Sequence, residues 1–247
     1  MKNAVKFLLQ SILGYRRYIR FFASFKVKTL HSDSREKDFM HFLSMLPEEG
    51  TVLDIGANLG FLSVHIARHL SNGNVVAFEP MPDNLDALNY VVKKFKLKNV
   101  RVEACALGNE DGMVEMVLPV EGKAKQQGLS HVVHEGITEH NEGIRFKVPI
   151  RKLDDISFLF EPGADITGIK IDVENFEQYV LAGGQKLIGT YHPLLYIELW
   201  DNDNQKNCFR MMKELGYSVK VHVNGTLVDF NKSVHTDKIN FFFVYGK

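Results

Sequence analysis

The chain has few cysteines and no net charge. Only Cys105 and Cys208 occur among its 247 residues, the first in an apolar strand-like stretch and the second in a predicted helix. We therefore expect buried thiols in a reducing compartment, the cytoplasm, and no disulfide or metal framework. Because 30 Lys and Arg balance 30 Asp and Glu, the whole molecule has no general attraction to nucleic acid, and we expect no nucleic-acid partner.

Long apolar runs are also missing. Residues 1–32 hold seven Lys or Arg and no acid, and no uncharged stretch approaches the roughly 20 residues that span a bilayer. No secretory signal is recognisable. We expect residues 1–34 to form a basic amphipathic helical arm. The arm either packs on the domain or on a second copy of the chain, or it lies on the inner face of an anionic membrane; residues 35–247 are expected to form one domain.

The order of apolar patterns predicts an α/β fold with a mostly parallel, seven-stranded sheet. Residues 113–150 interrupt this parallel pattern. They contain two runs in which apolar and polar residues alternate, one on each side of a polar stretch, which indicates an inserted hairpin. Two further runs, 217–223 and 239–245, are expected to form an antiparallel edge pair joined by a turn at Asn224–Gly225. The other expected strands are 52–55, 75–79, 99–106, 168–172 and 194–198, and the expected helices are 35–46, 61–68, 83–94, 176–188 and 203–215.

The most informative segment is 51–61, an apolar strand that ends in Asp54 and turns into a helix through spaced glycines. Such a turn predicts a nucleoside ligand over the N-terminus of the helix. A dinucleotide would bring its pyrophosphate close to the Asp54 carboxylate, so that two anions would face each other. S-Adenosylmethionine has no phosphate, and Asp54 can hold its ammonium group directly or through water. The predicted contacts of the turn are Gly56, Asn58, Gly60 and Phe61.

A second acid supports an adenosine-type ligand. Glu79 ends the next strand and precedes Pro80, where a carboxylate can accept hydrogen bonds from ribose hydroxyls. Ala106 ends the third strand and Leu107 opens the turn that follows, and both are expected near the adenine. A Gly-x-Gly-x-x-Gly motif is missing, which argues against a nicotinamide oxidoreductase. A module that binds the cofactor without turnover remains an alternative.

With these pieces in order, residues 50–247 resemble the FkbM family of S-adenosylmethionine-dependent methyltransferases. The resemblance implies a Rossmann-like class I methyltransferase fold and methylation of a hydroxyl on a sugar, a glycolipid or polysaccharide, or a secondary metabolite. This chain departs from the family at Asn175, where a glycine is common. The blocks that carry the resemblance are 52–61, 77–80, 106–108, 153–156, 169–174, 181–184 and 193–198.

Carboxylates at the strand ends are the candidate catalytic groups. Asp172 ends the fourth strand of the parallel pattern, and it is our first choice for the general base or for a group that orients the acceptor; its structural alternative is a helix cap. Glu174 is the second choice, although it is as easily a helix-opening residue. Glu198 ends the fifth strand and is expected either to bind acceptor hydroxyls or to make a structural hydrogen bond.

Metal ligands are not expected, although clustered carboxylates leave magnesium possible. His131, His134 and His140 lack cysteine partners and are predicted to be exposed loop residues, not zinc ligands. His131 remains a candidate base carried on a lid, with Ser130 beside it as a contact of the acceptor. His65 is expected to pack inside the first helix of the domain.

Overall fold

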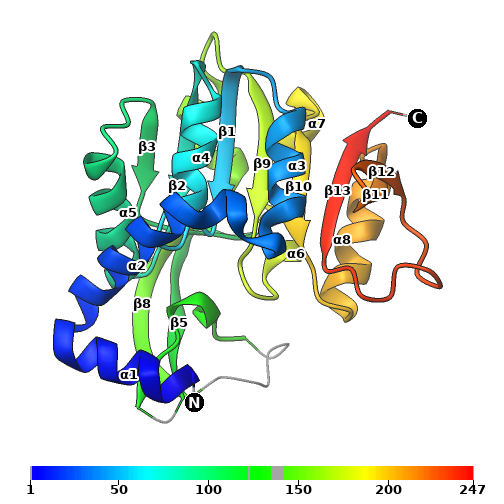
Figure 1. Cartoon of the computed structure of the whole chain (residues 1–247). Helices are drawn as coiled ribbons and strands as arrows, with labels where there is room; N and C mark the ends of the chain where they lie inside the picture. The colour runs from blue at the N-terminus through cyan, green and yellow to red at the C-terminus, as the bar shows by residue number, and fades with distance from the viewer. Residues whose placement is uncertain (1, 122, 135–141, 247) are drawn as a thin grey trace.

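The computed structural model describes residues 2–121, 123–134 and 142–246, and it contains a large β-sheet with helices on both faces (Figure 1). Eight strands are arranged in the order β12-β11-β13-β10-β9-β1-β2-β3. The strands from β10 to β3 are parallel, whereas β13, β11 and β12 pair antiparallel at one edge. In sheet order the bounds are Thr226–Asp229, Tyr217–Val223, Asn240–Tyr245, Leu194–Glu198, Ile166–Ile171, Glu49–Ile55, Asn72–Phe78 and Val100–Glu103.

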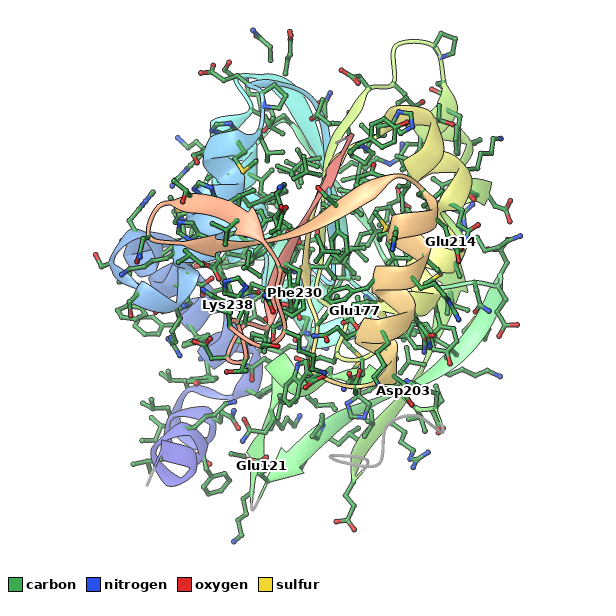
Figure 2. The ribbon with its side chains drawn as sticks, turned by 90° about the vertical axis from the view of Figure 1, so that its right-hand side faces the viewer. Glu121, Glu177, Asp203, Glu214, Phe230 and Lys238 are labelled. Carbon is green, nitrogen blue, oxygen red and sulfur yellow. The ribbon has the colours of Figure 1, made fainter. Side chains whose placement is uncertain are left out.

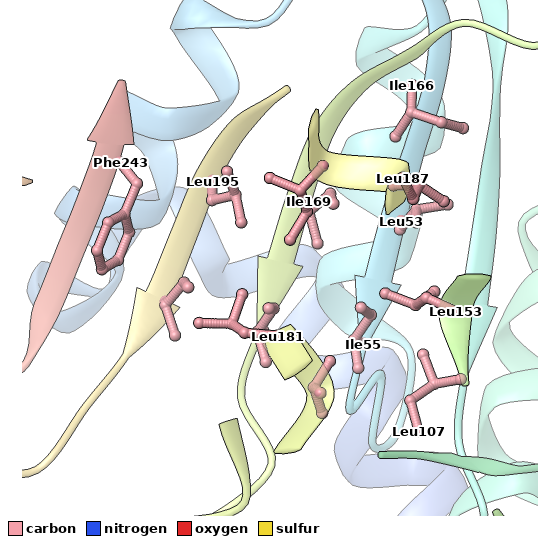
Figure 3. Packing of buried hydrophobic residues seen from close by; sticks show 14 of the residues in the cluster. Leu53, Ile55, Leu107, Leu153, Ile166, Ile169, Leu181, Leu187, Leu195 and Phe243 are labelled. Atoms are coloured by element: carbon pink, nitrogen blue, oxygen red, sulfur yellow. The ribbon is translucent and has the colours of Figure 1, made fainter. Parts of the chain in front are cut away.

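Alternate side chains of the central strands build two separate cores, because successive residues of a strand point to opposite faces. Leu53, Ile169 and Leu195 belong to one cluster (Figure 3), which α6 (Glu177–Ala182), α7 (Gln185–Tyr191) and α8 (Asp203–Glu214) cover. Val52 and Tyr196 point the other way, toward α3 (Lys37–Met45) and α4 (Phe61–His69). The apolar alternation in the sequence thus fixes which face each helix covers.

Three features differ from the sequence prediction. The large sheet has eight strands, not the expected seven, because residues 226–229 add β12 at the edge. The turn at Asn224–Gly225 connects β11 to β12, not to 239–245, since both turn residues have positive φ (50° and 88°) and form a tight hairpin. The expected helix 176–188 is interrupted between α6 and α7. A Cβ on Gly183 would lie 1.9 Å from the Gly108 carbonyl oxygen, so this close approach of two backbones requires glycine at the break.

The inserted hairpin is confirmed and forms the core of a second sheet. β5 (Gly112–Glu121) and β8 (Gly143–Arg151) pair antiparallel along their length. Figure 1 shows them beyond the carboxyl ends of the parallel strands, beside α1. Shorter pieces complete this unit: β4 (Ala106–Leu107), β6 (Ala124–Lys125), the 3₁₀ turn η3 (Gln127–Leu129) and β7 (His131–Val132).

The N-terminal arm forms two helices. α2 (Tyr15–Thr29) packs on α4 and on α5 (Pro82–Lys94), with Ile19 and Ala23 fully buried in that contact. Arg20 also donates two hydrogen bonds, of 2.7 and 2.6 Å, to the carboxylate of Asp86 on α5. α1 (Lys2–Leu13) lies beside β6. None of the helices in the described residues has the length and apolar character needed to cross a membrane.

Candidate functional site

A pocket lies at the carboxyl ends of β1, β2 and β9, where the sequence predicts a ligand. It contains about 580 Å³ of empty space, part of which is open to solvent. Met116 and Val132 of the second sheet close it from outside. Its lining includes the predicted residues Gly56, Asn58, Glu79, Pro80, Ala106 and Leu107.

Glu79 is held by the backbone around it. Its side chain is buried; Oε2 accepts a hydrogen bond from the Asn58 backbone N–H (2.8 Å), and Oε1 accepts one from the Met81 backbone N–H (2.8 Å). Burial raises the pKa of Glu79 to about 7, although these bonds act in the opposite direction. Because a carboxylate has about four acceptor positions, Glu79 retains capacity to accept bonds from ligand hydroxyls.

Three buried polar atoms in the pocket have no partner in the described part of the chain. They are Asn58 Oδ1, Gln127 Oε1 and Ser130 Oγ. Leaving such an atom unsatisfied costs about 1–3 kcal/mol, so a polar ligand or a water molecule has to supply the missing hydrogen bonds. Ser130, expected to contact the acceptor, therefore lies in this pocket. The position of Gln127 could not be predicted from the sequence, since nothing in a polar, glycine-containing stretch distinguishes one glutamine from another.

Asp54 lies beneath the turn and does not line the pocket. Its carboxylate is fully buried; Ser63 Oγ donates to Oδ2 (2.5 Å), and Lys170 Nζ lies 3.3 Å from Oδ1. The cation that we expected Asp54 to hold in a ligand is here a lysine of the chain. A contact between Asp54 and a cofactor stays a prediction.

Lys170 connects the turn with the acidic strand end. Besides Asp54, it lies 3.6 Å from Asp172 Oδ2 and donates a 2.9 Å hydrogen bond to the Gly56 carbonyl oxygen. Burial alone would lower the pKa of Lys170, but Asp54 and Asp172 together raise it above its usual value. Lys170 lies in a sequence block that carries the family resemblance, but the position of this lysine between two carboxylates could not be predicted from the sequence.

The backbone after β9 is unusual and explains the departure at Asn175. Glu174 and Asn175 have φ values of 54° and 70°, in the left-handed region that glycine and, less readily, asparagine adopt. Asn175 thus reproduces a glycine-like turn and also accepts a 2.6 Å hydrogen bond from Asn202 Nδ2.

Glu177 anchors the same loop from below. It is buried; its carboxylate accepts bonds from the Val173 backbone N–H (3.2 Å) and from Asn204 Nδ2 (2.5 Å). Figure 2 shows Glu177 beside the end of α8 that begins at Asp203. Burial raises the pKa of Glu177 to about 7. The loop that carries Asp172 is therefore fixed at both ends.

The two other candidate carboxyls differ in placement. Glu174 lines the pocket, and burial followed by repulsion from Asp172 raises its pKa to about 9. This shift favours the protonated carboxyl, and a role for Glu174 as the base stays a prediction. Glu198 lines a neighbouring cleft, and the same two causes raise its pKa to about 7. Within the described residues no set of three His, Cys, Asp or Glu side chains is arranged to hold a metal ion.

This neighbouring cleft meets the pocket. Asn58, Gln127, Gly128 and Asp172 line both hollows. The opposite wall of the cleft comes from the arm. This contact could not be predicted from the sequence, because only the tertiary fold brings α2 there. The arm contributes Phe22, Phe25, Lys26 and Thr29, and other walls include Arg35, Phe61, Tyr196, Glu198 and Asn240.

Four other residues that were predicted from the sequence do not line the pocket. Phe61 lines the cleft, not the pocket, and Gly60 lines neither; a Cβ on Gly60 would lie 2.4 Å from Leu88 Cδ1, so this glycine permits helix packing. His131 is buried, contrary to our expectation of an exposed loop residue, and its Nδ1 lies 2.8 Å from the Leu129 carbonyl oxygen, outside both linings. His65 packs in α4 as expected.

His134 also differs from the expected exposed loop residue. It is half-buried, and its ring packs on Phe176 and Tyr179. The contact with Phe176, which lines the pocket, brings the end of the hairpin connection over the loop that follows β9. His140 lies outside the described residues.

A family model and two curated relatives all match this chain to methyltransferases. The family model described as "Methyltransferase FkbM domain" matches residues 54–219. "Methyltransferase 1" of Beauveria bassiana is 22% identical over 156 residues, which are 59% of this chain and 63% of that protein. "Methyltransferase sdnD" of Sordaria araneosa is 23% identical over 167 residues, or 59% and 64%. The chain thus spans less than two thirds of these curated relatives.

A solved structure shows the same fold. The crystal structure of methyltransferase FkbM from Methylobacillus flagellatus superimposes with a TM-score of 0.53 and 17% identity, covering 81% of this chain and 45% of that one.

Proposed function

Since the chain belongs to the FkbM methyltransferase family, we propose that it transfers a methyl group from S-adenosylmethionine to a hydroxyl of an acceptor. The proposed acceptor class is a sugar, a glycolipid or polysaccharide, or a hydroxylated secondary metabolite. The observation that carries the proposal is the junction of pocket and cleft at Asn58, Gln127, Gly128 and Asp172. A donor in the first hollow and an acceptor in the second meet at this point.

The pocket fits S-adenosylmethionine better than a dinucleotide. Its described lining contains no Lys or Arg to neutralise a pyrophosphate. Glu79 suits the ribose hydroxyls, and the unpaired oxygens of Asn58 and Gln127 suit an ammonium group. Leu107 and Phe176 offer apolar surface for adenine. When bound, S-adenosylmethionine supplies a methyl group on a positively charged sulfur.

Asp172 is the carboxylate that both hollows share. In our proposal it accepts the hydrogen bond of the acceptor hydroxyl, orients that oxygen toward the pocket and receives its proton; such help contributes about a hundredfold or more. Lys170, 3.6 Å away, holds the Asp172 carboxylate in place. Glu198 binds further hydroxyls of the acceptor, and its pKa of about 7 lets it exchange a proton at neutral pH.

The shape of the cleft favours an acceptor with both apolar and hydroxylated parts. Phe22, Phe25 and Phe61 supply aromatic surface, while Glu198 and Asn240 supply hydrogen-bonding groups. Aromatic faces combined with a few polar groups are typical of small-molecule sites that fix the orientation of a ligand.

Two experiments test the proposal. Calorimetry compares S-adenosylhomocysteine with NAD, and we expect only the former to bind. Methyl transfer from labelled S-adenosylmethionine is then measured over sugar, glycolipid and polyketide acceptors. Preference for NAD, or binding without O-methyl product from any acceptor class, would contradict the proposal.

With an acceptor in hand, Asp172→Asn should lower methyl transfer by at least about a hundredfold and leave S-adenosylhomocysteine affinity within a few-fold, as expected for a group that acts in the transition state. The matched control is Asp203→Asn, because the Asp203 side chain is 90% exposed and lines neither hollow. A wild-type rate for Asp172→Asn would remove Asp172 from the mechanism.

A further inference from the structure

The first helix of the arm presents its apolar side to solvent. Its polar side faces the second sheet: Gln10 exchanges two hydrogen bonds with the backbone of Lys125 (3.2 and 3.1 Å), and Lys6 Nζ donates to Gln126 Oε1 (2.7 Å). An amphipathic helix that only packs on a domain buries its apolar stripe. The exposed apolar residues of α1 are Phe7, Leu8, Leu9, Ile12 and Leu13, with Ile12 at 69% exposure.

The second helix extends this surface and adds positive charge. Arg17, Phe21, Phe25 and Lys28 are exposed at helical spacing along one side of α2. Across the described residues, no acidic side chain pairs with Arg17 or Lys28. Other cations of α2 are neutralised, as Arg20 is by Asp86. We call the exposed residues Leu8, Leu9, Ile12, Leu13, Arg17, Phe21, Phe25 and Lys28 the arm face.

We propose that the arm face docks on an anionic lipid surface. Aliphatic and aromatic side chains enter the boundary between head groups and acyl chains, and unpaired cations bind anionic head groups. A second copy of this chain fits the arm face poorly. A twofold contact would bring the arms together, and residues 1–32 contain no acid to compensate Arg17 or Lys28.

The arm face and the cleft share Phe25, which is 53% exposed and also lines the cleft beside Phe22. Docking would therefore bring this rim of the cleft to the lipid surface. If methyl transfer is as proposed above, the acceptor is an amphiphile whose apolar part stays in the membrane and whose hydroxylated part reaches Asp172. This consequence depends on the proposed function, whereas docking itself does not.

Vesicle sedimentation tests the docking. The full chain is mixed with vesicles of phosphatidylcholine alone or with added phosphatidylglycerol, without cofactor. We expect sedimentation with the anionic vesicles only, decreasing as salt rises because the head-group attraction is screened. Ile12→Asp should weaken this binding by about tenfold or more, since it removes a membrane-buried aliphatic side chain. Its control is Val234→Asp, because Val234 has a nearly equal exposure of 67% but lies far along the chain, outside the arm.

Two charge-reversal variants complete the experiment. Lys28→Glu should weaken binding to anionic vesicles, and Lys213→Glu, at an exposed position of α8, should not. S-Adenosylhomocysteine binding by each variant shows that the fold is intact. Three results would overturn the proposal: no sedimentation of the wild type at low salt, equal sedimentation with neutral vesicles, or a dimer in light scattering that Ile12→Asp dissociates. A wild-type protein that sediments with anionic vesicles but does not bind S-adenosylhomocysteine would count only against the proposed function.

Discussion

At the scale of single residues, the site depends on charges that the fold removes from water. Glu79, Glu174 and Glu198 all have raised pKa values because burial disfavours the ionised carboxyl. Lys170 lies 3.3 Å from the buried Asp54 carboxylate, and this acid together with Asp172 raises the pKa of Lys170. The pocket and the neighbouring cleft thus contain buried carboxyls with raised pKa values close to a buried lysine.

Ligand affinity should therefore depend on pH through Glu79. Ribose hydroxyls donate to the ionised carboxylate, so the ligand binds the deprotonated form. Below the pKa of about 7, the affinity for S-adenosylhomocysteine should fall by up to about tenfold per pH unit. Calorimetry between about pH 6 and pH 8.5 measures this, and Glu79→Gln should bind weakly at every pH. An equally steep pH dependence in the variant would assign the proton to another group.

The same burial predicts what happens when the central cation is lost. Lys170→Met leaves Asp54 buried with Ser63 as its remaining partner, and removal of one member of a buried pair costs about 3–5 kcal/mol. The double variant Lys170→Met/Asp54→Asn should regain part of this loss, because no unpaired charge remains. Urea unfolding of the two single variants and the double variant measures the coupling; strictly additive effects would mean that the two side chains do not stabilise each other.

At the scale of elements, the hairpin connection completes the pocket. η3 and the residue after it carry Gln127 and Ser130 into the pocket, although they belong to the second sheet and are distant in sequence from the glycine turn. Adjacent elements of different sheets therefore share one ligand site.

Gln127→Ala tests this arrangement, because it should weaken ligand binding without lowering the stability of the ligand-free protein. Its Oε1 is buried without a partner in the described chain, so truncation removes an unsatisfied group and should not lower the free energy of unfolding of the ligand-free protein. It should nevertheless weaken S-adenosylhomocysteine binding by about tenfold, as expected on loss of a hydrogen bond to a charged group. Gln126→Ala is the control, because Gln126 binds Lys6 and does not line the pocket. Equal affinities for both variants would exclude Gln127 from ligand binding.

At the scale of the whole molecule, elements with a regular sequence pattern could be predicted from the sequence, whereas contacts between segments distant in the chain could not. Apolar alternation and glycine turns predicted the parallel strands, the inserted hairpin and the pocket at Glu79. Neighbouring residues do not reveal that α2 forms the cleft wall through Phe22 and Phe25, since that contact depends on how α2 packs on α4 and α5. The break at Gly183 has a similar cause, because only the tertiary fold shows that the backbone at Gly108 approaches it.

Burial of four glutamate carboxyls predicts how the free energy of unfolding of the whole molecule depends on pH. Glu79, Glu177 and Glu198 have pKa values of about 7, and Glu174 of about 9, against about 4.3 in an unfolded chain. Between these limits the folded state binds more protons than the unfolded state, so the free energy of unfolding should fall as pH rises from about 5 to about 8. Asp86 acts in the opposite sense, because its bond to Arg20 lowers its pKa, but its contribution is lost only in more acidic solution.

Urea unfolding at about pH 5 and about pH 8 measures this profile without ligand. Glu177→Gln should flatten it, because the amide keeps an acceptor for the Val173 backbone N–H but has no proton to lose. Asp203→Asn should keep the wild-type profile, since the Asp203 carboxyl is exposed at the surface. A wild-type protein that becomes more stable as pH rises across this window would show that these carboxyls are ionised in the fold at little cost, and the proton linkage assigned to Glu79 and Glu198 would then fail with it.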